Sequence, residues 1–318
     1  QHSSAASDVY KRQPLSGRTA LVTGATSGLG LETARALASR GARVLVAGRD
    51  PGRTDAAVQQ ASAAASDGGS AEPLALDLAS LASVRTAPDD AASLTERLDL
   101  LVNNAGVMAP ALGRTEDGFE TQMGTNHLGH FALTAWLMPL LLASTDPRVV
   151  TVSSTAHRTG SIDLDDLHYE RRSYSPWSAY GASKLANLLF TTELARRAAD
   201  AGTPLVAAAA HPGFAATNLQ FAGPSWAQNP IGRTVMRVAN GVMAQSAADG
   251  ALPQLYAATM PDVRGDEYIG PDGIAEARGG PTRVDRAEAA ADTGVARRLW
   301  EVSSQQTGAD ALAPEGTP

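Results

Sequence analysis

The stretch Thr19-Ala-Leu-Val-Thr-Gly24-Ala-Thr-Ser-Gly28-Leu-Gly30 decides the fold of this chain. Its first five residues form an apolar run typical of a buried β-strand, and the residues from Leu31 onward have a helical pattern. Glycines between a strand and a helix let the backbone approach a pyrophosphate, and the helix N-terminus presents free N–H groups to it. The spacing is G-x-x-x-G-x-G instead of G-x-G-x-x-G, but its place between a strand and a helix predicts a dinucleotide phosphate site.

Apolar runs alternate with helical segments along the rest of the chain. The expected strands are residues 43–47, 74–76, 98–102, 148–152, 205–210 and 267–269, and the clearest helices are residues 51–65, 117–143 and 177–201. This alternation favours a parallel sheet with helices on both faces. Since no internal repeat or linker divides the chain, we predict a single α/β domain of the Rossmann type.

The composition is that of a soluble globular protein, with 43% hydrophobic and 19% charged residues among 318. A formal net charge of -7 argues against nucleic acid or an anionic membrane surface as a partner. The chain has no cysteine, which excludes disulfides, thiolate metal sites and a cysteine nucleophile and fits a cytoplasmic location. No apolar run reaches the roughly 18 to 20 residues of a membrane span.

Both ends of the chain differ in composition from its middle. Residues 1–13 lack the apolar segment of a signal peptide, and we expect residues 1–16 to be a non-native or disordered tail. Residues 309–318 are rich in Ala, Pro and Gly, which favours a flexible tail. The catalytic domain is therefore expected to span residues 17–308.

A tyrosine and a lysine lie four residues apart in Ser175-Pro-Trp-Ser-Ala-Tyr180-Gly-Ala-Ser-Lys184, where Ser175 can cap a helix. Residues at i and i+4 share a helix face, so Lys184 would favour the ionised form of Tyr180. A charge at ~4 Å and an effective dielectric constant of ~20 is worth about 4 kcal/mol, or roughly three pKa units. A tyrosine whose pKa is lowered towards neutrality can exchange a proton with a substrate oxygen. An isolated Y-x-x-x-K also fits an ordinary surface helix.

Polar and small residues follow several expected strands, at the sheet edge where open parallel sheets bind ligands. Asp77 follows the third strand and is placed to bind an adenine amino group, although it equally fits the N-cap of the next helix. Asn103-Asn-Ala-Gly106 follows the fourth strand and allows a backbone to approach a ligand closely. Ser153 and Ser154 end the fifth strand, where a hydroxyl can orient a substrate carbonyl.

Asn126 lies inside the expected helix 117–143 among apolar neighbours. An asparagine there lowers helix propensity and needs hydrogen-bond partners, so we expect either a local kink or bound water, or a satisfied core amide. His127 and His130 have i, i+3 spacing, but no third ligand is evident, and we predict no metal site.

Taken in order, these motifs resemble the short-chain dehydrogenase/reductase family. The resemblance covers about residues 17–308 and rests on the glycine turn, Asn103-Asn-Ala-Gly106, Asn126, Ser154, Tyr180-x-x-x-Lys184 and Pro212-Gly213. It implies a doubly wound, seven-stranded parallel sheet with a nicotinamide cofactor along its C-terminal edge.

The resemblance also implies the residues of the site. The catalytic tetrad maps onto Asn126, Ser154, Tyr180 and Lys184. The expected cofactor-binding residues are Gly24, Thr26, Ser27, Gly28, Leu29, Gly30, Arg49, Asp77, Leu78, Asn104, Ala105, Gly106, Tyr180, Lys184, Pro212, Gly213 and Thr217.

The spacing of 26 residues between Ser154 and Tyr180 is about twice that of most family members. This insertion, with Asn126-His-Leu-Gly-His-Phe131, resembles the branch that contains retinol dehydrogenases, the WW-domain oxidoreductase and protochlorophyllide reductase. Many relatives pair through helices that correspond to residues 117–143 and 177–201, which allows a homodimer here.

The cofactor is expected to be NADP(H). Dinucleotide folds that use NAD usually carry an Asp or Glu about 20 residues after the glycine turn to bind the ribose 2′-hydroxyl. Here that position is Gly48, followed by Arg49, whose permanently charged guanidinium suits a 2′-phosphate. The alternative is that Arg49 pairs with Asp50.

The resemblance implies reversible hydride transfer between the nicotinamide and a carbonyl or alcohol. Tyr180 would act as acid or base, and Ser154 would orient the substrate oxygen. Lys184 would lower the tyrosine pKa and bind the ribose, and Asn126 would keep a water that relays protons. Two alternatives stay open: a non-catalytic NADP-binding sensor and a reductase of a C=C or C=N bond.

The irregular segment from Phe214 to about Gln245 suggests a substrate lid. Its bulky apolar residues, including Leu219, Phe221 and Trp226, favour a hydrophobic small-molecule substrate. The alternative is a surface excursion that packs on the core.

Overall fold

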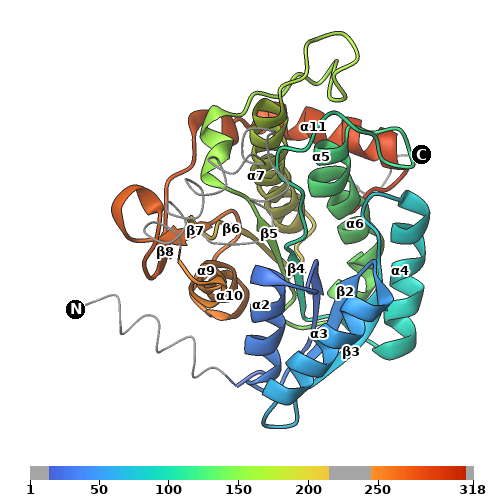
Figure 1. The fold of residues 1–318 in the computed structure, drawn as a ribbon, viewed down its shortest axis with the longest axis vertical. Helices are drawn as coiled ribbons and strands as arrows, with labels where there is room; N and C mark the ends of the chain where they lie inside the picture. Colours follow the sequence, from blue (N-terminus) through green and yellow to red (C-terminus); the bar gives the residue numbers. More distant parts are fainter. Residues whose placement is uncertain (1–13, 215–244, 313–318) are drawn as a thin grey trace, which may run out of the picture.

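An eight-stranded sheet forms the centre of the molecule in the computed structural model, which describes residues 14–214 and 245–312 (Figure 1). The strand order is β3-β2-β1-β4-β5-β6-β7-β8, and every neighbouring pair is parallel except β7 and β8. The strands are β1 Thr19–Thr23, β2 Arg43–Gly48, β3 Ser70–Ala75, β4 Leu100–Asn103, β5 Arg148–Val152, β6 Val206–Ala210, β7 Tyr268–Pro271 and β8 Pro281–Arg283. The prediction of a doubly wound, mainly parallel sheet is confirmed.

The number of strands differs from the predicted seven because β8 adds an edge strand within the described part of the chain. This strand has only three residues and begins with Pro281, so it lacks the apolar alternation that marks the other strands. Proline is tolerated at a sheet edge because it has no N–H to donate to a further strand.

Strand β1 lies where the order of the strands reverses, between β2 and β4. Leu21 of β1 pairs with Leu45 on one side and with Leu101 on the other. In an open α/β sheet the carboxyl ends of the strands on either side of such a reversal diverge and leave room for a ligand. The glycine turn after β1 therefore begins at the most favourable edge for a binding site.

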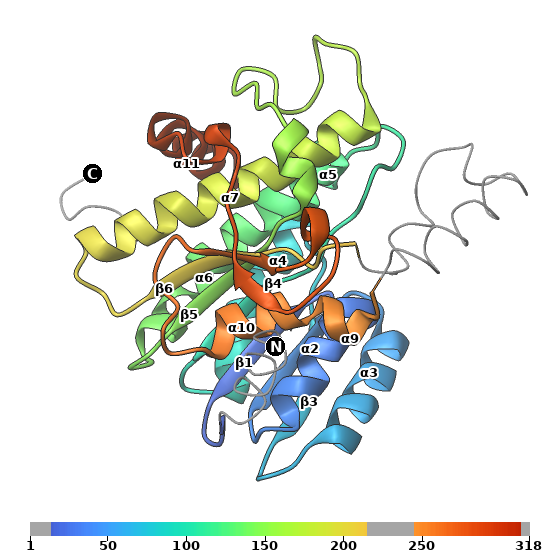
Figure 2. The ribbon, with the colours of Figure 1, turned by 90° about the vertical axis from the view of Figure 1, so that its left-hand side faces the viewer.

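Helices cover both faces of the sheet (Figures 1 and 2). Along β1, Ala20 and Val22 pack with helices on one face, whereas Leu21 packs into the core on the other, as a period of two requires. The helices are α2 Gly28–Ala38, α3 Pro51–Ala64, α4 Leu81–Leu94, α5 Thr121–Met123, α6 Gly129–Leu142, α7 Pro176–Asp200, α9 Ala247–Gly250, α10 Leu252–Thr259 and α11 Thr293–Thr307. Helices α2, α3 and α10 lie on the first face, and α4, α6 and α7 on the second.

The long helix expected over residues 117–143 begins only at Thr121 and is interrupted by a π-helical turn, Gly124–Leu128. Asn126 lies in this turn, and its side chain bonds to a loop outside the helix. Single π-turns often occur at functional sites because they re-aim side chains. The local irregularity expected at Asn126 is therefore present.

The insertion before Tyr180, residues 155–174, is partly packed against the rest of the molecule. Leu167 and Tyr169 are buried, and residues Thr155–Thr159 form a 3-10 turn. The ring of His168 stacks on Phe119 with centroids 5.2 Å apart. The sequence does not reveal this packing, because charged and apolar residues alternate in the segment and its apolar side chains contact segments that are distant in the sequence.

Helix α11 lies against α6 and α7 (Figure 2). Trp300 meets Phe131 edge-on at 4.8 Å and stacks on Phe190 at 5.8 Å between ring centroids. The Arg197 guanidinium lies 4.4 Å from the Trp300 ring centroid. A helix of the same chain thus covers part of the surface that we considered for a homodimer.

The packed chain extends slightly beyond the boundaries expected at residues 17 and 308. Leu15 is buried, and its N–H donates to the Arg40 carbonyl. Ala309 and Ala311 are buried in the core near Trp300. No helix within the described ranges combines the length and the apolar character needed to cross a membrane.

Candidate active site

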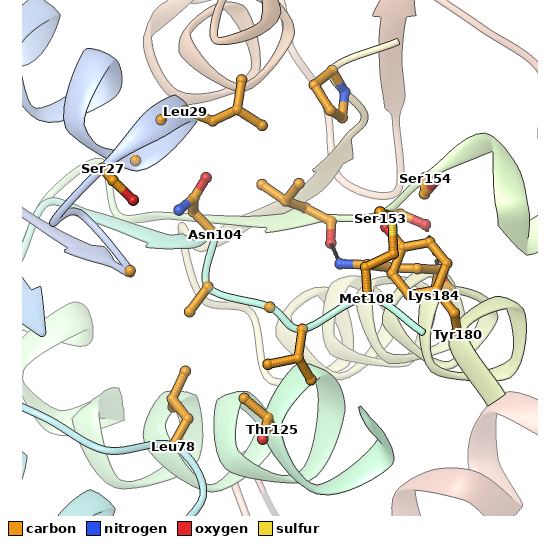
Figure 3. Close-up of a pocket in the computed structure, with 18 of the residues that line it drawn as sticks. Ser27, Leu29, Leu78, Asn104, Met108, Thr125, Ser153, Ser154, Tyr180 and Lys184 are labelled. Atoms are coloured by element: carbon orange, nitrogen blue, oxygen red, sulfur yellow. Dashed lines mark hydrogen bonds between the residues drawn. The ribbon is translucent and has the colours of Figure 1, made fainter. Parts of the chain in front are cut away.

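A cavity of about 620 Å³ opens at the carboxyl edge of the sheet (Figure 3). In Figure 3, Ser27 and Leu29 lie at one end of it and Ser154, Tyr180 and Lys184 at the other. Every residue that we expected to bind the cofactor lines this cavity except Thr217, which lies outside the described residues: Gly24, Thr26, Ser27, Gly28, Leu29, Gly30, Arg49, Asp77, Leu78, Asn104, Ala105, Gly106, Tyr180, Lys184, Pro212 and Gly213. The lid residues Leu219, Phe221 and Trp226 also lie outside the described residues.

The glycine turn offers backbone N–H groups to the cavity. Ser27 is the N-cap residue of α2, and its side chain makes no capping hydrogen bond. Gly24 and Gly28 have φ values of +63° and +55°, which glycine adopts without strain. A Cβ on Gly30 would lie 2.5 Å from the Gly24 carbonyl oxygen, so a side chain there would not fit. A compact anion at this uncapped helix end would receive free N–H groups and the positive end of the helix dipole.

The end of β2 carries an exposed cation beside this turn. Arg49 lines the cavity and forms no ion pair or hydrogen bond with any described residue. Asp50, which we considered as its partner, is instead the N-cap of α3 and accepts from the backbone N–H of Arg53 at 2.8 Å. The Arg49 guanidinium is therefore free for a ligand.

Asp77 lines the cavity at the end of β3 and is not the helix cap that we considered as an alternative. Ser80 is the N-cap residue of α4. One carboxylate oxygen of Asp77 accepts from the Ala79 N–H at 2.9 Å, and the Asp77 N–H donates to Ser83 Oγ. The second carboxylate oxygen has no partner among these contacts and can accept from a ligand.

The two serines at the end of β5 have different surroundings. Ser153 Oγ donates to the Lys184 carbonyl at 2.8 Å and is buried. Ser154 Oγ lies beside the Tyr180 hydroxyl, whose pKa it lowers, and accepts from the Ala156 N–H at 3.2 Å. Only Ser154 therefore has its hydroxyl beside the phenol.

Tyr180 and Lys184 are both buried, and burial dominates their titration. Burial raises the pKa of Tyr180 to about 12, and the nearby Ser154 hydroxyl opposes this rise. Burial lowers the pKa of Lys184 to about 8. The expected lowering of the tyrosine pKa is thus wrong for this structure. The ammonium lies 5.8 Å from the Tyr180 ring centroid and donates to the Val152 carbonyl at 3.0 Å.

Asn126 lies behind the cavity and holds its wall. Its Oδ1 accepts from the Val107 N–H at 2.8 Å, and its Nδ2 donates to the Val107 carbonyl and to Ser183 Oγ. A Cβ on Gly106 would lie 3.2 Å from Asn126 Oδ1 and 3.5 Å from Lys184 Nζ. With both amide atoms bonded to protein, Asn126 positions this loop, and these contacts do not support the water-holding role that we expected.

Sequence reasoning missed several apolar residues around Tyr180. Met108, Ala156 and Trp177 line the cavity together with Phe214, which we had assigned to the lid. The Trp177 ring meets the Tyr180 ring edge-on at 6.1 Å and is 50% exposed. Its i, i+3 spacing from Tyr180 on a helix was a usable signal, because such residues are neighbours.

Three buried histidines make the fold sensitive to acid. Burial lowers the pKa of His127 to about 3 and the pKa values of His130 and His211 to about 4, from a usual 6.5. Between about pH 6.5 and 4 the unfolded chain therefore binds more protons than the native protein, so stability falls as the pH falls through this window.

We expect His127→Leu to reduce this acid sensitivity. Each such histidine contributes a slope of up to about 1.4 kcal/mol per pH unit to the free energy of unfolding. Urea unfolding of both proteins at several pH values between 7 and 4.5 measures the slopes. Loss of the His127–Ser303 hydrogen bond lowers the free energy of unfolding by the same amount at every pH, so it does not affect the comparison of slopes. Equal slopes in the two proteins would contradict the buried, neutral state of His127.

Comparisons with known proteins agree with this geometry. The sequence model of the short chain dehydrogenases matches residues 18–227. Mouse polyprenol dehydrogenase is 42% identical over 304 residues, which are 93% of this chain and 85% of that protein. Mouse retinol dehydrogenase 14 is 39% identical over 303 residues, or 92% and 86% of the two chains.

Solved structures give the same result. The crystal structure of an uncharacterized protein from Mycobacterium paratuberculosis has a TM-score of 0.78 and 44% identity, covering 96% of this chain and 98% of that one. A 3-oxoacyl (acyl-carrier-protein) reductase from Agrobacterium tumefaciens with NADP bound has a TM-score of 0.61 and 27% identity, covering 80% and 90%.

Proposed function

Because this chain belongs to the short-chain dehydrogenase family, in its retinol dehydrogenase branch, we propose that it is an NADP(H)-dependent oxidoreductase. Its reaction is hydride transfer between the nicotinamide and a carbonyl or alcohol group of a hydrophobic small molecule. One observation carries the proposal: a single cavity has the glycine turn at one end and Ser154, Tyr180 and Lys184 at the other.

The residues present fit a phosphorylated dinucleotide. The uncapped N-terminus of α2 and the space left by Gly30 suit a pyrophosphate. Arg49 suits a 2′-phosphate, and the free carboxylate oxygen of Asp77 suits an adenine amino group. When bound, the nicotinamide supplies or accepts the hydride.

The proton moves at the hydroxyl of Tyr180. In reduction this phenol donates its proton to the substrate oxygen, and in oxidation it takes the proton back. The raised pKa keeps the phenol protonated in the cofactor-free protein, which is the form that acts as an acid. Ser154 Oγ, which lies beside the phenol, donates to the same substrate oxygen and so orients it.

Lys184 and Asn126 support this pair from behind. With a pKa of about 8, Lys184 is mainly charged at neutral pH, and its ammonium can donate to ribose hydroxyls as well as to the Val152 carbonyl. Asn126 holds Val107, whose neighbour Gly106 lies beside Lys184 Nζ. The Asn126 amide thereby holds the part of the cavity wall formed by Gly106 and Val107 in place beside the cofactor and the substrate.

The substrate end of the cavity is apolar. Met108 and Ala156 line it, and the partly exposed rings of Trp177 and Phe214 stand at its edge. Such a wall stabilises aliphatic or aromatic groups and offers few hydrogen bonds to a polar substrate.

A screen of NADPH oxidation with aldehydes, ketones, quinones and enones tests the proposed function. We expect turnover of hydrophobic carbonyl compounds. No turnover in the whole panel together with tight NADPH binding would favour a sensor over an enzyme. Higher catalytic efficiency with compact polar carbonyls such as sugars would contradict the hydrophobic substrate.

The preference for NADP(H) predicts a specific effect of Arg49→Ala. A charge-assisted hydrogen bond of about 1.5 to 3 kcal/mol corresponds to roughly ten- to a hundredfold discrimination, most of which this variant should lose. The measurement is kcat/KM with NADPH and with NADH. Arg53→Ala, in the first turn of the adjacent helix but not on the cavity wall, is the matched control.

Equal efficiency of the unaltered protein with NADPH and NADH would overturn the cofactor assignment. Adding a carboxylate at position 48 is a poorer test, because a Cβ on Gly48 would lie 2.5 Å from Thr26 Cγ2 and from Thr54 Oγ1. That substitution would displace the glycine turn as well as change the charge.

A further inference from the structure

His130 is a fully buried histidine of α6 that has no place in the mechanism described above. Its two ring nitrogens bond to two segments that are far apart in the sequence. Nδ1 lies 3.0 Å from the Asn126 carbonyl oxygen, and Nε2 lies 2.9 Å from Thr23 Oγ1 at the end of β1.

The partners determine where the hydrogens lie. A carbonyl oxygen can only accept, so Nδ1 of His130 carries the proton and donates to Asn126. Since the buried ring is neutral, Nε2 is an acceptor. The Thr23 hydroxyl donates to it at 2.9 Å in preference to the Val102 carbonyl, which lies 3.3 Å from Thr23 Oγ1. With its hydrogen directed at the ring, Thr23 Oγ1 has its lone pairs free for other donors.

Those lone pairs hold one end of the loop that lines the cavity. The backbone N–H groups of Asn104 and Ala105 donate to Thr23 Oγ1 at 2.9 Å and 3.0 Å. The other end of the same loop is held by the Asn126 side chain, which bonds to both the N–H and the carbonyl of Val107. His130 is bonded to both of the residues that hold this loop.

We propose that His130 is a positioning residue that joins the Thr23 and Asn126 contacts and so holds loop 104–107 against the cofactor and Tyr180. The proposal rests on the cofactor site proposed above. Nδ1–H bonds the carbonyl of the π-helical turn and keeps the Asn126 amide aimed at Val107, while Nε2 aims the Thr23 hydroxyl. The Asn126 amide also bonds to Ser183 Oγ, which donates to the Tyr180 carbonyl, so this side reaches the backbone of Tyr180.

Three variants separate the two contacts. His130→Leu removes both and should weaken NADPH binding, measured by fluorescence titration, by roughly tenfold or more. His130→Asn keeps an amide N–H at the place of Nδ1, so we expect a raised KM for NADPH with kcat largely retained. His130→Gln can place its carbonyl at the position of Nε2 and keep the Thr23 contact. For this variant we expect a lower kcat, with the KM for NADPH largely retained.

His127→Leu is the matched control, because His127 is equally buried in the same π-turn region but bonds to Ser303 of α11. It should change thermal stability without changing NADPH affinity. Equal losses of NADPH affinity in His127→Leu and His130→Leu would overturn the proposal. It would also be overturned if the two half-variants, His130→Asn and His130→Gln, changed the same kinetic parameter. Should His130→Leu fail to fold by circular dichroism, the two half-variants still decide.

A second measurement needs no cofactor. The ¹⁵N chemical shifts of His130 in the free protein report which ring nitrogen is protonated, and we expect protonated Nδ1 and unprotonated Nε2. A proton on Nε2 would overturn the proposal even if NADPH binds. Failure of the unaltered protein to bind NADPH, with the expected tautomer present, would instead overturn the proposed cofactor site and with it the role of His130 in cofactor binding.

Discussion

Tyr180→Phe is expected to lower kcat by about a hundred- to ten-thousandfold, the usual contribution of a positioned general acid or base. The substitution removes only the hydroxyl beside Ser154 and leaves the ring against Trp177 and Lys184. We therefore expect NADPH affinity to stay close to that of the unaltered protein. Steady-state kinetics with the best substrate of the screen and a fluorescence titration of NADPH measure the two quantities.

Tyr174→Phe is the matched control for this experiment. The Tyr174 hydroxyl is hydrogen-bonded in the interior, to Glu120 Oε1 and to the Pro110 carbonyl, but it does not line the cavity. It should leave kcat largely unchanged. If Tyr180→Phe kept more than about a tenth of the activity, the phenol would not be the proton donor.

Lys184→Met is expected to damage both catalysis and cofactor binding, since the variant loses the ammonium that we propose to bind the ribose and to support Tyr180. The change should not disrupt the wall, because the Val152 carbonyl also accepts from Asn187 Nδ2 at 3.0 Å and keeps a partner. Methionine has a similar length and suits the buried position. Kinetics and NADPH titration check the result, and unchanged NADPH affinity would contradict the ribose contact.

The same variant should gain stability. The pKa of Lys184 falls from a usual 10.5 to about 8 on burial, so below pH 8 the native protein holds a charge that is worth more in the unfolded chain. Removing it should raise the free energy of unfolding at pH 7 by up to about 3 kcal/mol. Urea unfolding measures this effect. A less stable variant would show that the ammonium is better solvated or paired than its burial indicates.

Much of the fold was predictable because its signals are local. Strands β1 and β5 have the predicted bounds, and the glycine turn and the capped start of α7 lie where the sequence placed them. Apolar runs, glycine spacing and capping residues determine the structure of residues that lie within a few positions of them in the sequence. Strand β8 was missed because its pairing with β7 depends on a distant segment and not on its own three residues.

Much of the candidate site was predictable as well, because the local signals that locate the strands also locate the residues at the strand ends. Asp77, Asn104 and Gly213 are far apart in the sequence, but each follows a strand, and a parallel sheet brings such ends to one edge. Trp177 was missed although its i, i+3 spacing from Tyr180 was a usable signal, because the cavity that it lines is formed by segments outside its own helix. The contacts of Asn126 were left open because a buried amide has several ways to satisfy its hydrogen bonds.

The sequence by itself determined the parallel sheet, the order of its elements and most of the residues that meet at the cavity, because periodicity, glycine turns and strand ends carry that information. Only the tertiary structure decided that the pKa of Tyr180 rises, that Asn126 holds Val107, and that His130 joins it to Thr23. Burial and hydrogen-bond partners depend on segments brought together from the whole chain. A Coulomb estimate made from the i, i+4 spacing of Tyr180 and Lys184 could not include the desolvation that outweighs it.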